Sequence, residues 1–175
     1  MMTAVLMMGV AGPVPVFADS KIEIDAKVSS ALEKFYETTL GGKSLAAKAA
    51  GMLVFPEVLK AGFGIGGEYG EGALLIGNKT AAYYNIASAS IGLQFGVQVK
   101  SQVLLFMNKK VLAEFRKSDG WEAGVDGSVA LATLGAGKEI DTNSAQDPII
   151  GYIFSNKGLM YNLTFEGSKI TRIEK

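Results

Sequence analysis

The sequence predicts an α+β domain, with N-terminal helices packed on a strongly curved, glycine-rich, mainly antiparallel sheet or small barrel. Two observations lead to this prediction. Apolar residues recur first at helical spacing and then, after Gly51, at a spacing of two. Glycine accounts for 22 of the 175 residues, and glycine inside strands marks bends and bulges. Because no break in composition divides residues 19–175, we expect them to form a single domain.

The composition excludes several function classes. Lys and Arg total 17, Asp and Glu total 17, and histidine and cysteine are absent. Without these two residue types the chain has no disulfide, no thiolate metal site and no Ser–His–Asp triad. The balanced charge is unlike the basic surface that nucleic acid requires. We therefore expect no nucleic-acid partner, no cofactor and no enzyme activity.

Residues 1–18 resemble the apolar part of a secretory signal peptide. They contain no charge, and Val16 and Ala18 place small or medium side chains where a signal peptidase recognises its substrate. The basic start of such a peptide is missing, as though it were truncated. A membrane anchor is the alternative, but the run is short and contains two prolines. The leader predicts an exported protein, periplasmic or peripherally attached to a membrane.

Two helices are predicted after the leader. Ser20 and Glu23 form a capping-box pattern. The apolar stripe of the first helix is Ile24, Val28, Ala31, Leu32 and Phe35. Gly41 and Gly42 end this helix, and a second one is expected over residues 44–50. The stripe can pack on the sheet or insert in lipid, and we favour packing.

Strands dominate the rest of the chain. The predicted strands are 52–55 (closed by Pro56), 62–77, 81–87, 91–99, 103–107, 122–134, 149–154, 159–165 and 170–173. Apolar residues alternate strictly with Gly, Gln and Lys over 91–99. Asn108 caps a predicted short helix that extends to Lys117. Residues 135–147 read as a loop, and 155–158 read as the turn of a hairpin.

Three motifs suggest chemistry but have simpler explanations. Residues 62–67 match G-x-G-x-x-G, yet neither a helix nor the required acidic residue follows, so we reject a dinucleotide site. Glu68 and Glu71 suggest a paired-carboxylate hydrolase, but their spacing in a glycine-rich turn fixes no common face. Asp119, Glu122 and Asp126 offer oxygen ligands for calcium without matching an EF-hand. Solvated turns are the favoured interpretation of both acidic groups.

Basic residues gather on or near the predicted helix after Asn108. They are Lys109, Lys110, Arg116 and Lys117. Their simplest role is a solvated helix face, and the alternative is contact with anionic lipid head groups. Trp121 follows a glycine turn and is interpreted as a core residue rather than an interfacial anchor.

Several segments together resemble the SYLF-domain family. They are AGMLVFP at 50–56, KAGFGIGGEYGEG at 60–72 and SIGLQFGVQ at 90–98, followed by shorter blocks up to residue 167. The resemblance covers residues 25–173. The signature positions, for which we expect a structural role, are Gly62, Gly64, Gly66, Gly67, Tyr69, Gly70, Gly72, Gly92 and Gly96.

This resemblance implies a lipid-binding or envelope-associated domain. Fungal and animal members bind phosphoinositides and, in yeast, actin. An N-terminal amphipathic helix assists lipid binding in the eukaryotic members. The first predicted helix here carries three lysines against four acidic residues, unlike a helix that binds anionic membranes. We therefore carry over neither the phosphoinositide specificity nor actin as a partner. The residues proposed to contact lipid are Lys60, Lys109, Lys110, Arg116 and Lys117.

Three functions are compatible with the sequence. The favoured one is a non-catalytic lipid-binding domain associated with the cell envelope. The second is a structural module that binds another envelope protein through the sheet. The third, a hydrolase that uses Glu68 and Glu71, is remote.

Overall fold

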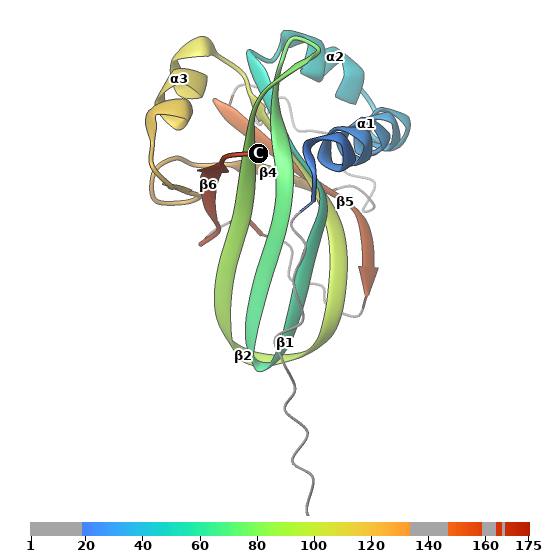
Figure 1. Ribbon diagram of the computed structural model, residues 1–175, viewed down its shortest axis with the longest axis vertical. Helices are drawn as coiled ribbons and strands as arrows, with labels where there is room; N and C mark the ends of the chain where they lie inside the picture. Colours follow the sequence, from blue (N-terminus) through green and yellow to red (C-terminus); the bar gives the residue numbers. More distant parts are fainter. Residues whose placement is uncertain (1–18, 134–146, 159–163, 166) are drawn as a thin grey trace, which may run out of the picture.

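The computed structural model describes residues 19–133, 147–158, 164–165 and 167–175. Within these residues the chain forms three helices and six strands (Figure 1). They are α1 (Lys21–Thr38), α2 (Gly42–Lys48), β1 (Gly51–Ile76), β2 (Lys79–Phe106), α3 (Lys109–Lys117), β3 (Trp121–Glu122), β4 (Ala130–Thr133), β5 (Ile149–Gly158) and β6 (Lys169–Ile173). The predicted α+β class, with helices at the N-terminus, is confirmed. The predicted leader, residues 1–18, lies outside the described residues.

Helix α1 packs on the sheet, as its apolar stripe predicts. The Ser20 side chain accepts a hydrogen bond from the backbone N–H of Glu23, and the Glu23 carboxylate accepts one from the backbone N–H of Ser20, completing the capping box. The buried residues of the helix are Ile24, Val28, Ala31 and Phe35. The Phe35 ring meets Tyr152 of β5 edge-on, with ring centroids 5.0 Å apart. The apolar stripe is therefore used within the domain.

Strands β1 and β2 form one very long antiparallel hairpin. Their register extends from Gly51 opposite Phe106 to Ile76 opposite Lys79. The prediction that Pro56 closes the first strand is wrong, because β1 continues through a bulge between Phe55 and Val58. A bulge accommodates proline, which has no N–H to donate to the ladder. The separate strands predicted within residues 52–107 are accordingly parts of two long ones.

Both long strands bend back on themselves at one end of the molecule. Figure 1 shows the bend at the lower end of the longest axis, away from the helices. Phe63 pairs with Phe95 and Ile65 pairs with Ile91, so one residue of β1 faces three of β2. Gly64 and Gly96 have φ of 72° and 118°, backbone conformations that glycine adopts without strain. We call this bend, formed by residues 63–65 of β1 and 91–96 of β2, the hairpin tip; it is distinct from the turn that joins the two strands.

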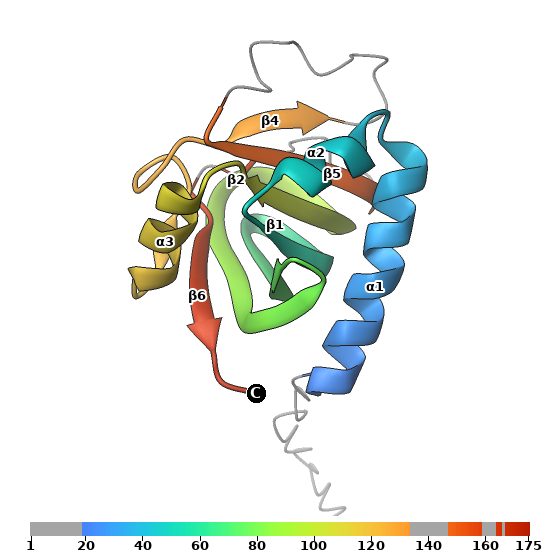
Figure 2. The same cartoon turned by 90° about the horizontal axis from the view of Figure 1, so that it is seen from above.

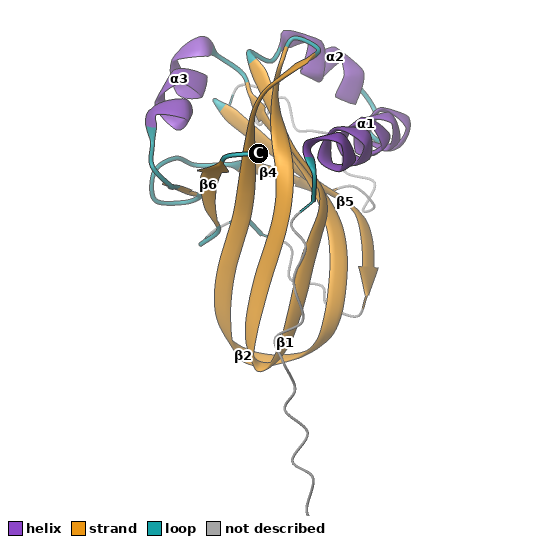
Figure 3. Cartoon of the chain, in the orientation of Figure 1, coloured by secondary structure: helices purple, strands orange, loops and turns teal. Residues whose placement is uncertain are grey.

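The sheet curls around an interior. Its order is β3-β6-β2-β5-β4, with β1 also paired to β2, and all pairings are antiparallel except that of β4 with β5. Figure 2 shows the curl from above, with α1 and α3 on different sides of the sheet. Figure 3 shows that helix is confined to the upper part of the molecule, while the lower part is strand. The predicted strong curvature takes the form of a half-barrel.

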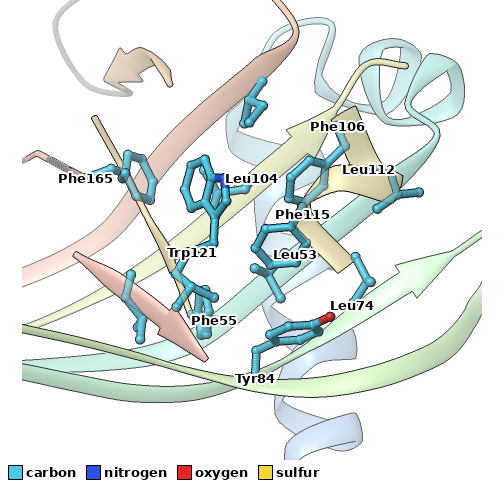
Figure 4. Packing of buried hydrophobic residues seen from close by; sticks show 14 of the residues in the cluster. Leu53, Phe55, Leu74, Tyr84, Leu104, Phe106, Leu112, Phe115, Trp121 and Phe165 are labelled. Carbon is cyan, nitrogen blue, oxygen red and sulfur yellow. The ribbon is translucent and has the colours of Figure 1, made fainter. Parts of the chain in front are cut away.

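Two hydrophobic clusters cover the two faces of the upper sheet. The first contains residues of β1, β2, β5 and β6 with α3 and Trp121 (Figure 4). Phe115 of α3 is its centre, 4.7 Å from the Phe106 ring and 5.8 Å from the Trp121 ring. The second cluster lies between α1 and the opposite face of β1, β2 and β5. Trp121 is 5% exposed and is a core residue, as predicted.

Two predictions in the C-terminal half are wrong. The strand predicted over 122–134 is interrupted by a turn at residues 124–126, which separates β3 from β4. The turn predicted at 155–158 lies inside β5, where Lys157 pairs with Val99 and Gly158 pairs with Gln98. The long β2 provides a pairing edge that outweighs the local turn signal. The predicted loop 135–147 and the second hairpin strand lie almost wholly outside the described residues, and the last strand is confirmed as β6.

Candidate functional site

The lower half of the long hairpin is apolar on its outer face. Five apolar side chains there are exposed by about half or more: Leu59 49%, Phe63 83%, Ile65 72%, Ile91 89% and Val97 59%. The α1 helix covers the same face of the sheet only in the upper half (Figure 1). This exposed surface, which we call the apolar end, comprises these five residues.

The inner face of the same strands is polar and buried. The side chains of Lys60, Glu68, Gln98, Lys100 and Gln102 are each at most 7% exposed. They alternate along β1 and β2 with the outward-facing residues, as the two-residue period of a strand requires. A sheet that packs one face on a core and exposes the other to water normally has the reverse arrangement. The lower hairpin is thus inverted, with polar groups inside and apolar groups outside.

A buried ion pair is the main interaction of this polar interior. The Lys100 Nζ lies 2.9 Å from Glu68 Oε2, and both side chains are nearly inaccessible. The Gln102 amide donates a 3.5 Å hydrogen bond to the other Glu68 oxygen. Burial lowers the pKa of Lys100, the Glu68 carboxylate opposes that shift, and the nearby Lys60 adds to it. The charged groups of the lower hairpin are therefore held inside and away from its outer face.

The signature glycines bring the two halves of β1 together. A Cβ on Gly72 would lie 2.0 Å from the carbonyl oxygen of Val54, and one on Gly70 would lie 2.6 Å from that of Glu57. A Cβ on Gly62 would lie 2.8 Å from the Cα of Gly66. Side chains at these positions would separate the layers that enclose the polar interior. The structure thus gives these glycines a packing role.

The basic residues proposed to bind lipid do not lie together. Lys109, Lys110, Arg116 and Lys117 are exposed on α3, at the helical end of the molecule. Lys60 is only 7% exposed and belongs to the interior of the lower hairpin. Figure 1 shows α3 and the hairpin tip at opposite ends of the longest axis. A single flat surface cannot contact both.

The acidic residues do not form the pair that a hydrolase would need. Glu68 and Glu71 are three residues apart on one strand, so their side chains leave opposite faces. Glu68 pairs with Lys100, whereas Glu71 pairs with Lys175 at 2.7 Å. This geometry does not support a paired-carboxylate site. The favoured interpretation of Glu68 and Glu71 as charges of a solvated turn is wrong, because both lie within β1 and their side chains are nearly inaccessible.

The acidic residues after α3 have a structural task as well. Asp126 accepts a 2.7 Å hydrogen bond from the backbone N–H of Glu122 and closes the turn after β3. Across the described ranges, no group of three or more Asp, Glu, His or Cys residues is placed to hold a metal ion. No described helix is long and apolar enough to cross a membrane.

The apolar end is the feature that residue-by-residue reading missed. The sequence showed strict alternation over 91–99 but not which face would be covered. Alternation alone is symmetrical, and the apolar face is assigned to the core by default. The available signal was the absence of Asp, Glu, Lys and Arg from residues 61–67 and 80–99, which leaves the outer face of both strands uncharged.

Comparison with known proteins identifies the family. The family model described as "Ysc84: Las17-binding protein actin regulator" matches residues 87–175. A Xenopus laevis protein named "SH3 domain-containing YSC84-like protein 1" is 28% identical over 127 residues, which are 70% of this chain. The chain spans 38% of the length of that relative. The chain belongs to the Ysc84 family, the SYLF-domain family that its sequence motifs predict.

Proposed function

We propose that this chain is a non-catalytic domain that binds lipid surfaces at the cell envelope. The observation that supports the proposal is the inverted lower hairpin, with its apolar end exposed and its charges inside. An exported location agrees with the leader-like residues 1–18. The family description names a binding protein and regulator, and a binding role for this chain agrees with it.

The size of the apolar end suits reversible attachment to a membrane. Burying one Ile or Phe side chain contributes about 1.5–3 kcal/mol. The three most exposed members are Phe63, Ile65 and Ile91. Together they contribute a free energy of membrane association on the order of that of one acyl chain. A single myristoyl chain gives a membrane association constant of about 10⁴ M⁻¹. We therefore expect peripheral binding that is measurable at millimolar lipid.

Vesicle flotation tests the proposal. The full chain is mixed with zwitterionic phosphatidylcholine vesicles or with vesicles containing anionic phosphatidylglycerol, and then centrifuged in a density gradient. At about 1 mM lipid we expect most of the protein to float with both vesicle types, because the apolar end carries no charge. Protein that stays at the bottom with both types would contradict a lipid-binding function.

A protein partner is the second candidate function. Strand β4, four residues long, is the last strand on its side of the described sheet. An edge strand offers backbone groups to which another chain can add a strand. A pull-down that recovers one stoichiometric envelope protein without lipid would favour this alternative.

A further inference from the structure

We infer that the hairpin tip penetrates the hydrocarbon of the membrane, with the long axis of the domain upright and α3 facing away from the lipid. The inference rests on the proposed function and assigns it to one element. It also predicts that binding depends on insertion into the hydrocarbon and not on the charge of the lipid head groups. The residues placed deepest are Phe63, Ile65 and Ile91.

The position and shape of the tip support insertion. Figure 1 shows the tip as the convex lower end of the molecule, with both strands turning there. Phe63 and Ile65 flank the bend in β1, and Ile91 lies opposite Ile65 on β2. These three side chains are 72–89% exposed. A convex apolar end can enter a fluid layer without needing a complementary surface.

The charge distribution favours lipid over a folded protein partner. No Asp, Glu, Lys or Arg occurs in residues 61–67 of β1 or 80–99 of β2. A charge in the hydrocarbon is costly, so a lipid-inserted surface must lack charges. A protein interface instead surrounds its apolar centre with a polar rim. Lys60 and Glu68 are buried inside the hairpin. The exposed charges at the upper margin of the apolar end are Glu57, which pairs with Lys27, and Lys157, which lies opposite Val99.

The position of the basic helix α3 distinguishes binding through the tip from binding through basic residues. The four basic residues of α3 lie at the opposite end of the long axis from the tip. In the upright orientation they remain outside the electrostatic field of the membrane surface, which decays within about 10 Å at 0.1 M salt. Binding through the tip should therefore be insensitive to lipid charge and to substitutions in α3.

A pair of matched variants tests this assignment. Phe63→Ser with Ile91→Ser removes two apolar side chains from the tip, and Ile22→Ser with Leu40→Ser removes two that are 82% and 83% exposed at the helical end. We expect the tip variant to lower the partition coefficient on phosphatidylcholine vesicles at least about tenfold. The control and the charge reversal of Lys109 and Lys110 to Glu should bind within about twofold of the wild type. Thermal unfolding checks that all variants are folded.

Each outcome bears on a different claim. Wild-type protein that does not float contradicts the proposed function itself. If the wild type floats and the tip variant floats equally well, only the assignment to the tip is overturned. The same holds if the α3 variant alone loses flotation. Sedimentation equilibrium tests a second copy of this chain as the occupant. If the wild type is a dimer and does not float, and the tip variant is a monomer, self-association through the tip replaces lipid insertion.

Discussion

Replacing Lys100 with methionine is expected to lower the free energy of unfolding by about 3–5 kcal/mol at neutral pH. The substitution leaves the Glu68 carboxylate buried without its ammonium partner, which lies 2.9 Å away in the native protein. An unpaired buried charge costs far more than the pair contributes. Urea unfolding followed by circular dichroism measures the change.

Two further variants separate the lost pair from lost packing. Replacing both Lys100 and Glu68 with methionine removes the unpaired charge, so we expect the double variant to be more stable than Lys100→Met alone. Lys60 has no carboxylate oxygen within 4.0 Å in the described part of the chain, so Lys60→Met should cost less than Lys100→Met. Equal stability of Lys100→Met and the wild type at neutral pH would refute the role of the pair.

Replacing Gly72 with alanine is the second large effect, with an expected loss of about 3 kcal/mol in the free energy of unfolding. The new Cβ would lie 2.0 Å from the Val54 carbonyl oxygen and 2.7 Å from the Phe55 ring. Neither contact involves the free end of a flexible side chain, so the two halves of β1 must separate. The midpoint of urea unfolding provides the measurement.

The matched control for this substitution is Gly67→Ala on the same strand. A Cβ there meets only the Ser88 carbonyl oxygen at 3.9 Å, an ordinary contact. We expect Gly67→Ala to change the unfolding free energy by less than about 1 kcal/mol. If both glycine variants lost the same stability, the claim that close packing of the two halves of β1 requires glycine at position 72 would be wrong.

The local elements of the fold were predictable and the long ones were not. The α1 helix depends on signals within a few residues, namely the Ser20 cap and the apolar stripe, and it was predicted nearly to its ends. The extent of β1 and β2 depends on pairing between residues up to 55 positions apart, such as Gly51 with Phe106. Local signals such as Pro56 and the 155–158 turn therefore misplaced strand ends. The glycine string did predict curvature, because bends and close approach both require glycine.

The candidate site shows a similar division. The basic residues of α3 were found from the sequence because charge is visible there, and they are exposed as expected. The apolar end depends on which face of an alternating strand remains uncovered. In this protein α1 covers the upper half of that face and stops short of the lower half. Only the three-dimensional arrangement of a helix and a bent sheet reveals this.

The most direct test of the account is the depth of the hairpin tip in a lipid bilayer. Phe63→Trp places a fluorophore at the tip, and vesicles with bromine at known acyl positions quench tryptophan that reaches the same depth. Trp121, the single natural tryptophan, is buried in the core at the other end and serves as the reference in the wild type. We expect strong quenching of Phe63→Trp by acyl-chain bromines and none of Trp121. Unquenched fluorescence from Phe63→Trp in protein that floats with the vesicles would contradict insertion of the apolar end.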